Sequence, residues 1–115
     1  MELITNEIKE RLQCYPLYSQ DGKGKRAKCV AKFFLAQGAW TWYVLEADLE
    51  EGTFFGITIN GHGEGEYGYT SINELQNVKS RIGTEVERDL WFEPTILKDI
   101  DDEYLQEFLT NMYGE

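Results

Sequence analysis

The chain has 115 residues, a net charge of −10, and a composition that is 42 % apolar and 14 % aromatic. This length is typical of one domain, so we expect residues 1–115 to form a single unit with its own core. The apolar content excludes a disordered chain despite the charge, and the absence of any run of about 18 apolar residues excludes a transmembrane helix.

The N-terminal segment predicts a helix. Thr5 or Asn6 is a suitable N-cap residue, because its side-chain oxygen can accept a hydrogen bond from the first helical turn. Ile4, Ile8 and Leu12 then recur every four residues and form one apolar stripe.

Three strands follow in the middle of the chain. Residues 28–35 and 40–46 are rich in the aromatic and β-branched side chains that suit a pleated surface. The Gln37-Gly38 turn between them indicates a hairpin. Residues 54–59 have the same character and predict the third strand.

The next segment is harder to assign. Residues 60–68 are glycine-dense and predict either an irregular loop or a weak strand. Residues 67–70 are the best candidates for a fourth strand. Residues 86–92 predict a fifth strand or an extended segment.

Two helices are predicted in the second half of the chain. Ser71 and Glu74 have the spacing of a capping box, which predicts a short helix ending near Lys79. Residues 101–113 predict the last helix, whose acidic first turn suits the helix dipole. Its apolar stripe comprises Ile100, Tyr104, Leu105, Phe108, Leu109 and Met112.

Strands that follow one another with short turns predict antiparallel pairing. Helices at the two ends of this strand block can cover a face of the sheet. We therefore expect an α+β fold, with a single antiparallel meandering sheet of about four to five strands packed by two or three helices.

Charge is unevenly distributed. Residues 1–45 carry seven Lys/Arg against four Asp/Glu, whereas residues 46–115 carry four against seventeen. A net-negative surface repels phosphate, which argues against direct binding to a nucleic-acid backbone. The acidic half instead suits a protein partner with a basic surface.

The cysteines and the N-terminus indicate a cytoplasmic protein. Residues 1–7 lack the basic region and long apolar run of a signal peptide. Two cysteines are too few for a secreted disulfide scaffold, so we expect Cys14 and Cys29 to be reduced, although a bridge between them stays open.

Several short motifs occur in order along the chain: Leu3-Ile4-Thr5, Pro16-Leu17-Tyr18-Ser19-Gln20 with Gly22, Lys32-Phe33-Phe34, Trp40-Thr41-Trp42-Tyr43 with Glu46 and Asp48, Phe54-Phe55-Gly56, Gly68-Tyr69 with Ser71 and Glu74-Leu75, and Glu87-Arg88-Asp89 with Phe92 and Pro94. In this order they resemble the domain of unknown function 2958 family, small proteins often encoded on plasmids and conjugative elements. The similarity covers roughly residues 3–97, and the final helix, from Asp99 onward, departs from the pattern. The resemblance implies a mobile-element setting, and it supplies no reaction and no catalytic residues.

His62, Glu64 and Glu66 alternate with glycines and are a candidate metal site. If the segment is extended, alternation places all three on one face, where an imidazole and two carboxylates can bind a divalent metal. The alternative is a solvated glycine-rich loop, because this spacing alone is not specific.

The aromatic strand is a candidate surface for a protein partner. Trp40 and Trp42 share one face and Tyr43 lies on the other, so either both faces are buried or one is an exposed aromatic platform. Glu46 and Asp48 follow on the same strand and could form an acid/base pair, although charged residues leaving a strand are more often solvated. We assign partner binding to these five residues.

Three functional hypotheses follow. The leading one is a non-catalytic protein-binding accessory factor of a mobile genetic element. The second is a DNA mimic whose carboxylates stand in for phosphates and block a restriction or CRISPR-type enzyme. The third is a small metal-dependent enzyme that uses His62, Glu64 and Glu66. Since the sequence has no P-loop, zinc-ligand spacing or dinucleotide fingerprint, we predict no cofactor and assign no catalytic residue.

Overall fold

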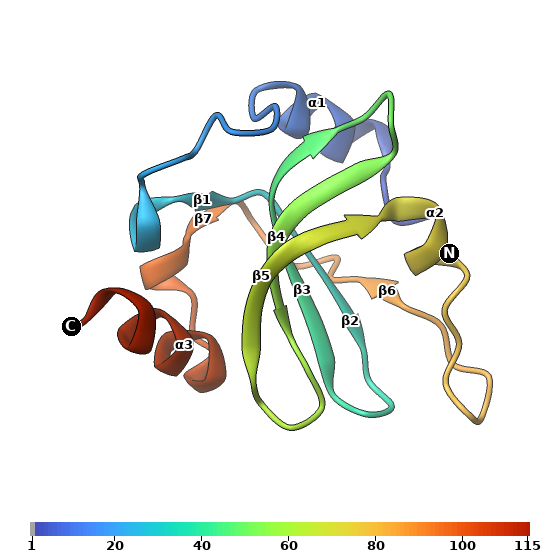
Figure 1. Ribbon diagram of the computed structural model, residues 1–115. Coiled ribbons are helices and arrows are strands. Elements are labelled where there is room, and N and C mark those ends of the chain that lie inside the picture. Colours follow the sequence, from blue (N-terminus) through green and yellow to red (C-terminus); the bar gives the residue numbers. More distant parts are fainter. Residues whose placement is uncertain (1) are drawn as a thin grey trace.

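The computed structural model describes residues 2–115, and its centre is a five-stranded antiparallel sheet (Figure 1). Four consecutive strands form a meander: β2 (Ala31–Leu35), β3 (Trp40–Asp48), β4 (Thr53–Ile59) and β5 (Gly65–Ser71). The chain then crosses to the other edge and adds β6 (Glu87–Arg88) beside β2, which gives the order β5-β4-β3-β2-β6. The predicted α+β fold and antiparallel meander are confirmed.

A two-stranded ribbon was not predicted. It pairs β1 (Lys28–Cys29) with β7 (Thr95–Ile96). The strand expected over residues 28–35 is therefore divided at Val30, whose N–H donates to the Val44 carbonyl at 2.8 Å. Val30 and Ala31 both belong to the same core cluster, which an unbroken strand with strict alternation does not allow.

Helices occupy both sides of the sheet. Among residues 2–115 the structure has α1 (Asn6–Gln13), α2 (Ile72–Gln76), α3 (Glu103–Tyr113) and the 3₁₀ turns η1 (Gly24–Arg26) and η2 (Leu97–Asp99). The Thr5 hydroxyl accepts the Ile8 N–H at 3.3 Å and caps α1, as predicted. In this part of the chain no helix has the length and apolar character needed to cross a membrane.

The second helix is shorter than expected. The Ser71 hydroxyl accepts the Glu74 N–H at 3.2 Å, as the capping pattern predicts. However, α2 ends at Gln76, because Lys79 forms a β-bridge with Glu85 and so belongs to a short hairpin.

The last helix buries only part of the predicted stripe. Leu105 and Leu109 are buried, whereas Tyr104 and Met112 are exposed. The physical reason is that Ile100 lies in an extended segment before α3, so it does not continue the helical spacing.

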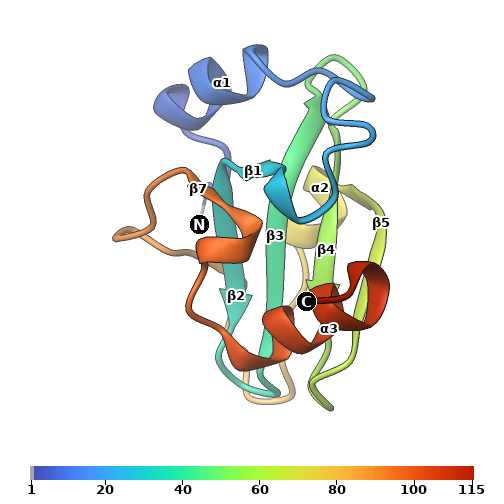
Figure 2. The ribbon, with the colours of Figure 1, turned by 90° about the vertical axis from the view of Figure 1, so that its left-hand side faces the viewer.

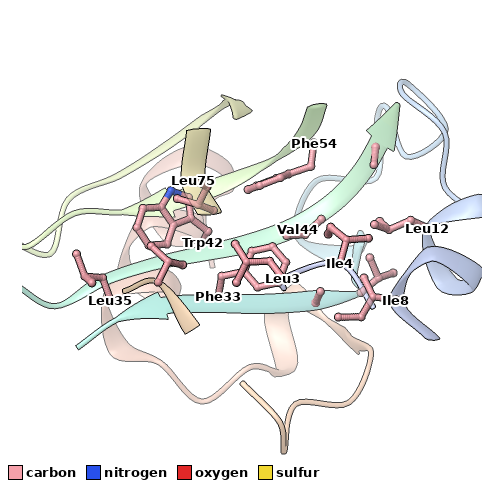
Figure 3. Close-up of a cluster of buried hydrophobic side chains, with 14 residues drawn as sticks. Leu3, Ile4, Ile8, Leu12, Phe33, Leu35, Trp42, Val44, Phe54 and Leu75 are labelled. Carbon is pink, nitrogen blue, oxygen red and sulfur yellow. The ribbon is translucent and has the colours of Figure 1, made fainter. Parts of the chain in front are cut away.

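Both faces of the sheet are buried. Figure 3 shows the first cluster, in which α1, α2 and the N-terminal segment pack on one face; its members include Leu3, Leu12, Phe33, Trp42, Val44 and Phe54. Figure 2 shows α3 lying across the opposite face, where the second cluster includes Tyr43, Leu45, Ile57, Leu97, Leu105 and Leu109. The result is three layers with the sheet in the middle.

A β-bulge changes which side chains of β3 face each cluster. The register between β3 and β4 shifts between Val44 and Glu46. Such a bulge adds one residue and turns the following side chains by one position. Leu45 and Glu46 consequently line the same hollow, beside Phe55 of β4.

The strand facing the bulge requires a glycine. A Cβ on Gly56 would lie 1.9 Å from the carbonyl oxygen of Tyr43, which no side chain tolerates. Gly68 pairs with Gly56 on the neighbouring strand, and a Cβ there would have no heavy atom within 4 Å. A side chain is therefore excluded at Gly56 and has room at Gly68.

We expect Gly56→Ala to lower the free energy of unfolding by about 2 kcal/mol or more, because the backbones of β3 and β4 must separate. Gly68→Ala is the matched control, and its effect should stay within about 0.5 kcal/mol. Urea unfolding followed by circular dichroism measures both, and equal effects would contradict the close approach at Gly56.

Candidate functional site

The five residues predicted to bind a partner do not form one surface. Trp42 and Tyr43 are buried on opposite faces of the sheet, and Glu46 is only 3 % exposed. Trp40, 39 % exposed, begins β3, whereas Asp48 ends this nine-residue strand. The aromatic strand is thus covered on both faces and is no exposed platform.

Glu46 holds the loop that follows α1. Its Oε1 accepts the Tyr18 N–H and its Oε2 accepts the Gln20 N–H, both at 2.8 Å. The Gln20 side chain in turn donates to the carbonyls of Lys28 and Leu45, both at 2.8 Å. Tyr18 has a φ of +74°, which is unfavourable for a side chain of this size. Glu46 therefore fixes this loop, since both of its carboxylate oxygens accept backbone N–H groups of the loop.

His62, Glu64 and Glu66 lie on and beside the turn between β4 and β5, and all three are exposed. Asn60 shapes this turn, because its Oδ1 accepts the N–H groups of His62 and Glu64 at 2.9 and 3.0 Å. Within residues 2–115, no group of three or more His, Cys, Asp or Glu side chains is placed to hold a metal ion. The structure does not bring the predicted triad together.

A hollow of about 460 Å³ lies at this end of the sheet. Trp40, His62, Asp102 and Tyr104 all line it. The Asp102 carboxylate accepts a short hydrogen bond from the Tyr43 hydroxyl and, through its other oxygen, caps the first turn of α3. Because both oxygens already serve the fold, Asp102 is poorly suited to act as a base for His62.

The Tyr43–Asp102 contact changes the acidity of the phenol. Burial, followed by the hydrogen bond to Asp102 and its charge, raises the pKa of Tyr43 well above its usual range. Burial and a hydrogen bond to Tyr113 likewise raise the pKa of Tyr67. Both phenols are held neutral in the folded chain.

The most exposed aromatic side chain was not predicted. Trp91 is 91 % exposed and its neighbour Leu90 is 67 % exposed, in the segment that protrudes between β6 and β7 (Figure 2). Tryptophan is seldom left so open, because its ring has a large apolar area. In the sequence, Leu90, Trp91 and Phe92 read as part of a strand, so only the turn-forming Asp89 signalled a change of direction.

Asp89 fixes the Leu90–Trp91 turn in place. Its N–H donates to the Lys32 carbonyl at 2.9 Å, and its Oδ1 accepts the Trp91 N–H at 2.9 Å. Its Oδ2 lies 3.7 Å from the Lys32 Nζ. The next residue, Phe92, packs against the second core cluster. The two exposed side chains are therefore held on a rigid support.

Charged side chains of both signs surround this turn. Glu87 and Glu93 are exposed on its two sides. Arg11 approaches Glu93 only to 4.0 Å, while it hydrogen-bonds Glu7 at 2.7 Å. Arg11 and Arg88 line the hollow beside Leu90 as well, so the rim of the apolar tip carries both signs, and its acidic side chains are the more exposed.

Comparison with known families gives one result. A family model described as protein of unknown function (DUF2958) matches residues 3–100, which confirms the resemblance carried by the motifs. No curated protein and no solved structure gives a significant match. The matched region includes the Leu90–Trp91 turn and ends just before α3.

We expect Glu46→Gln to lower the free energy of unfolding by about 1.5–3 kcal/mol, because the new amide turns a donor toward one of the two backbone N–H groups. Glu50→Gln is the control, since Glu50 is exposed and lies just beyond β3. Urea unfolding measures the difference. An unchanged midpoint in Glu46→Gln would show that the loop does not depend on this carboxylate.

The raised phenol pKa values predict loss of stability at high pH. In the unfolded chain tyrosine ionises near pH 10, whereas Tyr43 and Tyr67 stay neutral in the folded chain. Stability is therefore fully present below about pH 10 and falls as the pH rises above it. Urea midpoints between about pH 8 and 11 should fall less steeply in Tyr43→Phe than in wild type, while the exposed control Tyr104→Phe keeps the wild-type slope. Identical slopes in all three would contradict the assignment.

Proposed function

The chain belongs to the DUF2958 family of proteins of unknown function, and we propose that it is a non-catalytic protein-binding accessory factor of a mobile genetic element. The observation that carries this proposal is the Leu90–Trp91 turn. Trp91 is 91 % exposed, so a partner can bury far more of its apolar area than the fold of the chain does.

Rigidity makes this turn an effective anchor. Binding is weakened by the entropy lost when flexible side chains are ordered. Because Asp89 already fixes the backbone of Trp91, the ordering that remains at the moment of binding is that of the exposed side chains. Tryptophans in such positions often dominate an interface and cost about 2 kcal/mol or more when removed.

The partner's chemistry follows from the rim. Exposed Glu87 and Glu93 favour a partner that offers an apolar pocket bordered by Lys or Arg. The reduced thiols of Cys14 and Cys29 suit the cytoplasmic location that such a role requires.

The two alternatives have weaker support. A DNA mimic needs carboxylates along one surface. Glu50 and Glu51 lie on the β3–β4 turn and Glu64 lies beside the β4–β5 turn, at opposite ends of β4 (Figure 1). For the metal-dependent enzyme, no observation favours His62, Glu64 and Glu66 over other exposed polar groups. We therefore retain protein binding as the proposal.

The test compares capture of a partner by three variants. Cross-linking in cells followed by affinity capture should recover a partner with wild type and lose it with Trp91→Ala, by about 30-fold in affinity. Ile82→Ala is the matched control, because Ile82 is also apolar and largely exposed but lies on a different hairpin. Added salt should reduce the captured amount.

Trp91→Ala should leave the unfolding midpoint nearly unchanged, within about 0.5 kcal/mol, so that lost capture reports the surface and not the fold. Capture that is equal in wild type and Trp91→Ala would refute the proposal. Sedimentation that shows a homodimer for wild type and a monomer for Trp91→Ala would assign the turn to self-association instead.

A further inference from the structure

A second hollow, of about 330 Å³, opens beside the C-terminal end of α3, toward the other edge of the sheet from β6. We call it the tyrosine cleft. Its volume is near the lower end of the range for small-molecule sites, about 300–1,000 Å³. It is separate from the Leu90–Trp91 turn, so it is independent of the proposed function.

Aromatic rings form one side of the tyrosine cleft. Phe55 of β4 and Tyr67 of β5 stack with ring centroids 5.7 Å apart and planes 4° apart. Tyr113 of α3 joins them, because its hydroxyl and that of Tyr67 are hydrogen-bonded at 2.6 Å. Rings of this kind attract cations through their negative faces.

A buried carboxylate lies at the base of the cleft. Glu46 accepts two backbone N–H groups, but none of the ion pairs formed among residues 2–115 involves it. The two backbone N–H groups satisfy this carboxylate without a cationic partner, so the base of the cleft is polar and acidic. Asp21, which is exposed, adds a second carboxylate to the lining.

The lining of the cleft contains no Lys or Arg. The nearby Lys25 instead donates to the Gly114 carbonyl at 3.1 Å.

We propose that the tyrosine cleft binds a small organic cation, an ammonium or guanidinium group on a short aliphatic stem. The cationic head lies between Asp21 and the aromatic rings, with the Glu46 carboxylate at the base of the cleft. The stem lies along Phe55 and Met112, which supply the apolar part of the lining. The same head group occurs on free amines and on Lys or Arg side chains.

The probe is agmatine, which carries both kinds of cation on a four-carbon stem. Titration followed by amide chemical shifts should give saturable changes at residues 20–24, 45–46 and 112–113, with a Kd of about 1 mM or tighter. Asp21→Asn should weaken binding about two- to fivefold, as expected for an exposed charge pair. Tyr113→Leu should weaken it by a similar factor through the lost ring.

Two control variants keep the test specific. Glu64→Gln removes an exposed carboxylate outside the cleft, and Tyr104→Leu removes an exposed tyrosine from the same helix. Both should bind agmatine as wild type does. Asp21→Asn tests the proposal even if Tyr113→Leu unfolds α3, because Asp21 is exposed and its removal leaves the core unchanged.

A second titration, with a peptide, distinguishes a protein side chain from a free amine as the source of the cation. If a blocked Gly-Arg-Gly peptide binds at least as tightly as agmatine, the cleft takes an arginine side chain; if only agmatine binds, it takes a free amine. Either result supports the proposal. Absence of saturable shifts with both probes, equal binding of butyrate, or an unchanged Kd in Asp21→Asn with either probe would overturn it.

Discussion

The fold depends on the burial of β3 from both sides. Tyr43 and Val44 are adjacent in the chain and neither is exposed, so two separate covers are required. Burying one such side chain contributes about 1.5–3 kcal/mol, which makes each cover costly to lose. Segments from both ends of the chain supply them: α1 on one face and α3 on the other. The bulge after Val44 then turns Glu46 toward the loop that needs its carboxylate.

The spacing of apolar residues along the chain was sufficient to predict much of this fold. The predictions were wrong where contacts between segments far apart in the sequence determine the structure. The meander and α1 were predicted because their apolar spacing matches the faces they bury. The break at Val30 was not, since it arises from pairing β1 with β7, some 67 residues further along. The stripe predicted on α3 included both Tyr104 and Leu105, but only Leu105 is buried, because the extended segment around Ile100 shifts the phase of the helix.

At the candidate sites, too, residue type was visible in the sequence, whereas exposure was determined by the fold. Residue type pointed to Glu46 as a partner-binding residue, but the bulge buries it, and a bulge has no signature in a single sequence. Trp91 carried no functional signal, because its neighbours Leu90 and Phe92 are equally apolar. Exposure is decided by the Asp89 hydrogen bonds, which turn Phe92 inward and leave Trp91 outside. Sequence reasoning finds chemistry-bearing residues more readily than it finds which of them face solvent.

The residues matched by the family model include one of the two proposed surfaces and only part of the other. It ends at Ile100, whereas α3 begins at Glu103, so it includes the Leu90–Trp91 turn but not the helix that supplies Tyr113 to the tyrosine cleft. A chain without a helix equivalent to α3 must cover the Tyr43 face in another way, and its cleft would lack one wall. Partner binding, as proposed, uses the Leu90–Trp91 turn inside the matched region, although neither residue is among the motifs that carry the resemblance. Cation binding, as proposed, also needs Tyr113, which lies outside the matched region.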